Sequence, residues 1–69
     1  MVILANGVFD LFHVGHLRYL EQAAQWGDLF VGVTTDSGVN KKGRPIIPQE
    51  ERLEIVRRQM CVKEARLCL

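Results

Sequence analysis

Hydrophobic residues along this chain follow two alternating patterns. Near-continuous apolar runs cover residues 2–5 and 28–34, and a third begins at residue 66. Runs of this length are typical of parallel strands that are covered on both faces. We therefore predict strands at 2–5 and 28–34 and the start of a third strand over 66–69. The turn dipeptide Asn6-Gly7 is expected to end the first strand.

The segments between these runs show helical spacing. Residues 15–26 carry apolar positions at intervals of three and four, which predicts a helix that stops before Gly27. A second helix is expected to begin near Pro48, because Glu50 and Glu51 suit the positive end of a helix dipole. The residues expected to face the core are Leu17, Leu20, Ala23 and Ala24 in the first helix and Leu53, Val56 and Met60 in the second. Tyr19 and Trp26 are also assigned to packing.

Strands that alternate with helices predict a parallel sheet with right-handed crossovers. The order β-α-β-α-(β) indicates an α/β, Rossmann-like fold that is half of a doubly wound sheet, in a single partial domain over residues 1–69. Such sheets bind ligands beyond the carboxyl ends of their strands. The loops 6–15 and 35–47 leave those ends and are the candidate functional segments.

Composition narrows the class of protein. The chain has 69 residues, of which 48% are hydrophobic and 25% charged, and its net charge of +1 argues against general nucleic-acid binding. Eight of its nine basic residues follow residue 40. Among these, Lys41, Lys42 and Arg44 either form a solvated face or contact a phosphate. We expect Cys61 and Cys68 to be reduced, partly buried thiols in a cytoplasmic protein without a signal peptide or membrane span.

Two histidines separated by three positions are the strongest chemical signal. His13 and His16 fall where the first strand has ended and a helix begins, with Gly15 between them. A helix start presents free N–H groups and positive potential, which favour phosphate binding, and imidazoles add hydrogen-bond donors. The alternatives are one capping histidine beside an unrelated one, or a zinc site, for which a third ligand at useful spacing is missing. The glycine patterns of P-loops and of dinucleotide-binding sites are absent.

The run from Gly7 to His16 resembles the G-x-F-D-x-x-H-x-G-H signature of the cytidylyltransferase-like nucleotidyltransferases. Similarity extends over about residues 2 to 64 and includes Thr35-Asp36 and Glu51-Arg52. The segment 43–56 is most similar to bacterial heptose-phosphate adenylyltransferase domains, followed by glycerol-phosphate and phosphoethanolamine cytidylyltransferases. The resemblance implies transfer of a nucleotidyl group from ATP or CTP to a sugar or alcohol phosphate, with release of pyrophosphate.

The resemblance also implies roles for individual residues. His13 and His16 would stabilise the transition state, and Lys42 would contact phosphate with them. Nucleotide-binding positions are Gly7, Val8, Phe9, Asp10, Gly15 and Arg44. Positions on the acceptor or phosphate side are Asp36, Lys41 and Arg52. The resemblance implies no metal site in the protein itself, and Mg²⁺ would arrive with the triphosphate.

Members of this family are longer than this chain and carry a C-terminal nucleotide-binding segment that has no match here. We therefore expect part of the family's domain, with an exposed edge on its first strand. Because such an edge favours pairing with another chain, we predict a homo-oligomer. The alternative to an enzyme is a truncated, non-catalytic module that only binds nucleotide.

Overall fold

The computed structural model describes residues 1–39 and 45–68 and contains a three-stranded sheet beside two helices. Its strands are β1 (Val2–Gly7), β2 (Asp28–Thr34) and β3 (Glu64–Cys68), and its α-helices are α1 (Val14–Ala24) and α2 (Gln49–Arg57). A short 3₁₀ helix, η1 (Asp36–Gly38), follows β2. This confirms the predicted α/β, Rossmann-like architecture.

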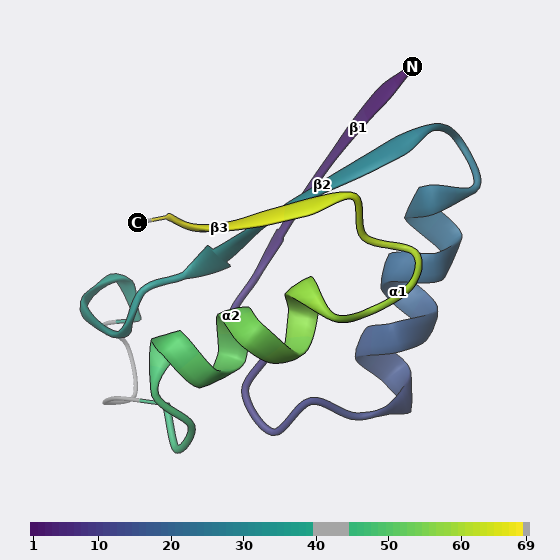
Figure 1. Cartoon of the computed structure of the whole chain (residues 1–69). Helices are drawn as coiled ribbons and strands as arrows, with labels where there is room; N and C mark the ends of the chain where they lie inside the picture. Colours follow the sequence, from purple (N-terminus) through teal and green to yellow (C-terminus); the bar gives the residue numbers. More distant parts are fainter. Residues whose placement is uncertain (40–44, 69) are drawn as a thin grey trace.

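All described strands run parallel in the order β1-β2-β3. Right-handed crossovers between neighbours that advance in one direction place their helices on the same face of a sheet. Figure 1 shows α1 and α2 on one side of the three strands. Because the three strands are parallel, their carboxyl ends point toward the same end of the molecule.

The bounds of β2 are those predicted, whereas the other elements differ at their ends. β1 continues through Asn6 and Gly7, because these residues pair in register with Gly32 and Val33 of β2. The helix α1 begins at Val14 and ends at Ala24, and its C-cap is Gln25, so Gly27 lies beyond the cap. β3 begins two residues earlier than predicted, at Glu64.

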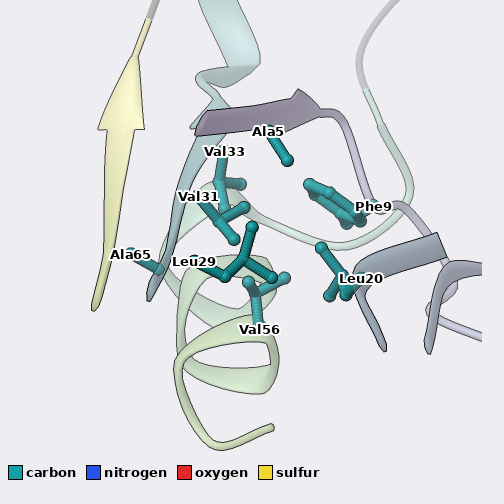
Figure 2. Close-up of a cluster of buried hydrophobic side chains, with 8 residues drawn as sticks. All are labelled: Ala5, Phe9, Leu20, Leu29, Val31, Val33, Val56 and Ala65. Atoms are coloured by element: carbon teal, nitrogen blue, oxygen red, sulfur yellow. The ribbon is translucent and has the colours of Figure 1, made fainter. Parts of the chain in front are cut away.

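The core lies between the sheet and the two helices. Alternate residues of β2 point toward the helices, and Leu20 and Val56 meet them from α1 and α2 (Figure 2). The buried apolar residues are Ala5, Phe9, Leu20, Leu29, Val31, Val33, Val56 and Ala65. Cys61 and Cys68 are free and half-buried, as predicted, and desolvation raises the pKa of the Cys61 thiol.

Three of the predicted packing residues lie on the surface, and one of them, Tyr19 of α1, is 48% exposed. Met60 is fully exposed because α2 ends at Arg57, before the helical stripe could include it. Trp26 is 71% exposed because it follows the end of α1, where the chain turns into β2. The fully buried polar residue on α2 is instead Arg52.

The second face of the sheet is open, which corrects the expectation that its strands are covered on both sides. A groove of about 500 Å³ runs along this face between apolar residues of β1 and β2 and the charged pair Glu64 and Arg66 of β3. Leu4, which points into the groove region, is 76% exposed. Within the described residues β1 pairs only with β2, so its other side is a free edge.

Replacement of the core residue Leu20 by alanine should lower the free energy of unfolding by about 2–5 kcal/mol, because the side chain is fully buried and leaves a cavity. Urea denaturation followed by circular dichroism measures this loss. Met60→Ala is the matched control, since its fully exposed side chain loses no burial. Equal destabilisation by the two variants would contradict the assignment of the core.

The free edge of β1 should lead to self-association, since unpaired strand edges pair with other chains. Sedimentation velocity should show a dimer or larger species that dissociates on Leu4→Lys, a charge placed beside the edge. A monomer at all concentrations would contradict this expectation.

Candidate functional site

The loop between β1 and α1 forms the centre of the candidate site. Its backbone turns through two left-handed residues, Phe9 with φ 57° and Leu11 with φ 49°. Such angles are uncommon for residues other than glycine and cost of order 1–3 kcal/mol each. Gly7 allows the turn, because a Cβ there would lie 2.9 Å from the Phe9 ring. The loop thereby directs Phe9 into the core and delivers His13 to the start of α1.

His13 and His16 cap α1 reciprocally. The N–H of Gly15 donates to Nδ1 of His13 at 3.0 Å, and the N–H of His13 donates to Nδ1 of His16 at 3.1 Å. The arrangement resembles a capping box, with imidazoles in place of the usual hydroxyl and carboxylate. Both histidines are therefore capping residues, whereas the sequence had suggested at most one.

The capping hydrogen bonds determine which nitrogen of each ring carries the proton. Since Nδ1 of each ring accepts a hydrogen bond, each neutral imidazole carries its proton on Nε2. The ring centroids are 4.1 Å apart, so two neighbouring rings each carry one Nε2–H donor near the positive end of α1. This pair of donors suits an anion such as a phosphoryl group.

Aromatic rings surround His16. Its ring meets the Phe9 ring edge to face at 5.6 Å and the Phe12 ring at 5.3 Å. Desolvation lowers the pKa of His16 below its ordinary 6.5, the nearby His13 lowers it further, and Asp10 opposes the shift. Burial therefore favours the neutral form of His16, in which the proton lies on Nε2 because Nδ1 accepts a hydrogen bond.

Asp10 joins the loop to the segment that precedes α2. Its carboxylate accepts hydrogen bonds from the N–H groups of Ile46 and Ile47, both at 2.9 Å. These two bonds, Ile46 first, hold the pKa of Asp10 below its usual 3.8. Its carboxylate thus links the loop to backbone that lies 36 and 37 residues away in sequence.

Asp36 and Arg52 form an ion pair behind the loop, with 2.6 Å between Oδ1 and Nη2. Arg52 was predicted on the acceptor or phosphate side; in this structure it is fully buried, and its guanidinium donates hydrogen bonds to protein groups. Asp36 is one-quarter exposed and is likewise engaged within the protein. The predicted phosphate contacts Lys41, Lys42 and Arg44 lie outside the described residues.

Sequence reasoning missed Gln49 at the start of α2. Its side-chain Oε1 accepts from the N–H of Asp36 at 2.8 Å, and its N–H donates to Oδ2 of Asp36 at 3.4 Å. These bonds fix the turn after β2 relative to α2. No local pattern predicts such a pair, because the partners are separated by 13 residues.

Residues 1–39 and 45–68 contain no cluster of three or more histidine, cysteine or acidic side chains placed to hold a metal ion. In the same part of the chain, neither helix is long and apolar enough to cross a membrane.

Comparison with known proteins places these residues in context. The family model described as cytidylyltransferase-like matches residues 4–67, which include the capped histidines and the Asp36–Arg52 pair. FAD synthase of Methanohalophilus mahii is 48% identical over 66 residues, covering 94% of this chain and 46% of that protein. The chain therefore spans about half the length of such relatives.

Two further proteins are similar to this chain, one in sequence and one in both sequence and structure. The bifunctional protein HldE of Geobacter sulfurreducens is 46% identical over 65 residues, covering 88% of this chain and 13% of that protein. A lipopolysaccharide core biosynthesis protein from Thermoplasma volcanium has a crystal structure that matches with a TM-score of 0.94 and 34% identity, covering 100% of this chain and 58% of its own.

The lowered pKa of His16 predicts how stability depends on pH. Below about pH 6.5 the unfolded chain binds a proton at this ring that the folded chain resists, so the free energy of unfolding should fall as pH drops through that window. Urea titrations at several pH values, roughly from 5 to 8, measure the slope. In His16→Asn, whose amide oxygen still accepts from His13, the fall should be smaller. An unchanged slope in that variant would contradict the assignment.

Proposed function

Since this chain belongs to the cytidylyltransferase-like family, we propose that it transfers an adenylyl group from ATP to a phosphorylated small molecule, with release of pyrophosphate. The observation that carries the proposal is the pair of Nε2–H donors at the start of α1, fixed by backbone bonds to both Nδ1 atoms. Preorganised donors of this kind stabilise charge that develops on a phosphoryl group.

In the proposed reaction, a phosphate oxygen of the acceptor forms a bond to the α-phosphorus of ATP. The bond from that phosphorus to the oxygen bridging the α- and β-phosphates breaks, and its electron pair leaves with pyrophosphate. Negative charge builds on the α-phosphoryl oxygens as the new bond forms, and His13 and His16 donate hydrogen bonds to them. The chain needs no covalent intermediate, because positioning and charge stabilisation are sufficient.

Mg²⁺ is proposed to enter with ATP. The two carboxylates predicted for the site are both engaged within the protein, Asp10 by the N–H groups of Ile46 and Ile47 and Asp36 by Arg52. They are therefore poorly placed to build a magnesium cage, and triphosphate oxygens suit the ion better. When bound, the ion would neutralise charge on the leaving pyrophosphate.

The acceptor that we propose first is FMN, because several relatives are named FAD synthase and adenylyl transfer to FMN makes FAD. Heptose 1-phosphate is the second, supported by the similarity to HldE and to the lipopolysaccharide core biosynthesis protein. The two kinds of relative are nearly equally identical to this chain, at 48% and 46%. This segment therefore suits the chemistry that such enzymes share, which is attack on the nucleotide.

The test is pyrophosphate release with ATP or CTP and each of four acceptors: FMN, heptose 1-phosphate, glycerol 3-phosphate and phosphoethanolamine. Turnover with ATP and FMN is expected. Turnover only with CTP would favour a cytidylyltransferase, and turnover with ATP and heptose 1-phosphate the second acceptor. Calorimetry distinguishes the enzyme from the alternative, a non-catalytic module that only binds nucleotide. Nucleotide binding without turnover of any acceptor would support the module and contradict the enzyme.

Replacement of either histidine should abolish most of this activity. His13→Ala and His16→Ala each remove one donor, and the expected loss in kcat is about 10²–10³-fold. Each also removes a helix cap, which costs about 1 kcal/mol, so circular dichroism should confirm that the variants remain folded at the assay temperature. Tyr19→Phe, a half-exposed position on the same helix, is the matched control and should keep full activity. Retention of activity in both histidine variants would contradict the mechanism.

A further inference from the structure

Arg52 is a buried cation that the proposed reaction does not use directly. Its Nε–H donates to the carbonyl of Ile47 at 2.8 Å, and its Nη1 donates to the carbonyls of Val8 and Thr34, both at 2.7 Å. Its Nη2 pairs with Asp36 at 2.6 Å. One guanidinium thus joins the loop after β1, the end of β2 with the turn that follows it, and the segment before α2.

Helix stability does not account for an arginine at this position. Arg52 lies near the N-terminal end of α2, where the helix dipole disfavours a positive charge. Burying an ion pair costs desolvation free energy, and well-packed apolar residues are often as stable or more stable. What the guanidinium supplies is geometry, since its planar fork of N–H groups reaches several fixed acceptors at once.

Arg52 is hydrogen-bonded to the loop after β1 next to its strained, left-handed residues. The carbonyl of Val8 directly precedes Phe9, the first of the two left-handed residues. On the far side of Phe9, Asp10 is bonded to Ile46 and Ile47, and the Ile47 carbonyl returns to Arg52. The strained backbone is therefore fastened on both sides of Phe9 to the segment before α2.

Phe9 carries this constraint to the catalytic end of α1. Its ring is buried and meets the His16 ring edge to face, with centroids 5.6 Å apart. We propose that Arg52 is a positioning residue that sets the His16 ring, acting through the Val8 carbonyl and the Phe9 ring. The proposal deepens the function proposed above and rests on it for its catalytic consequence, but the position of the ring can be measured without substrate.

The first test is NMR titration of the His16 ring in Arg52→Lys. Lysine keeps the charge but lacks the planar fork, so it cannot hold all of these acceptors in one plane. We expect the Phe9 ring to loosen its contact, which should weaken the nuclear Overhauser effect between the Phe9 and His16 rings. The pKa of His16 should then rise toward 6.5, since desolvation is the main cause of its lowering. Arg58→Lys, an exposed arginine at the end of the same helix, should leave both quantities unchanged.

A second variant keeps the test decisive if Arg52→Lys does not fold. Asp36→Asn retains an oxygen acceptor for Arg52 but removes the partner charge. Direct loss of a negative charge would lower the pKa of a nearby histidine, whereas looser positioning of Phe9 would raise it. A rise in the pKa of His16 therefore supports the proposal. An unchanged or lowered value in Asp36→Asn, together with an unchanged value in any folded Arg52→Lys protein, would overturn it.

The activity assay adds the catalytic consequence. In Arg52→Lys, kcat for pyrophosphate release should fall about 10- to 100-fold, the effect expected of a small misplacement, while KM for ATP changes little. A change confined to KM would contradict a positioning role toward His16. If the unaltered protein shows no turnover with any acceptor, the proposed function fails, but the NMR titration still decides whether Arg52 positions the ring.

Discussion

The hydrogen bonds from two backbone N–H groups to two imidazoles at the start of α1 are the constraint on which this structure depends. They satisfy donors that a helix start leaves free, and they also fix the tautomer and orientation of both rings. One set of atoms therefore serves the fold and the chemistry. Because Nδ1 of each ring accepts a backbone hydrogen bond, the Nε2 edge of each ring stays available as the N–H donor on which the proposed function rests.

A core this small cannot impose that geometry alone. Among the described residues, eight buried apolar side chains fill the space between the sheet and the helices, and the loop that carries His13 lies at the edge of this core. The loop is held instead by polar groups of residues far away in sequence, through Asp10 and Arg52. Polar cross-links with well-defined directions complement apolar packing here, because apolar contacts have little directional preference.

The sequence predicted those features that depend on local pattern. The bounds of β2, the parallel topology and the placing of His13 and His16 at a strand-to-helix junction all follow from apolar spacing and from a short motif. Features set by distant partners were not predictable in this way. Arg52 resembles a surface residue in sequence, and only the meeting of segments 44 residues apart shows that it is buried. In the sequence, Met60 continues the apolar spacing of the second helix, but α2 ends at Arg57, before this residue.

The strand order has a consequence for how such a domain can diversify. Both helices cover one face, and β1, which leads to the histidines, lies at the free edge of the described sheet. A further strand parallel to β1 at that edge would bring its own carboxyl end beside the histidine pair, leaving α1, α2 and their contacts as they are. Side chains can therefore be added beside the histidine pair without altering the hydrogen bonds that fix the two rings.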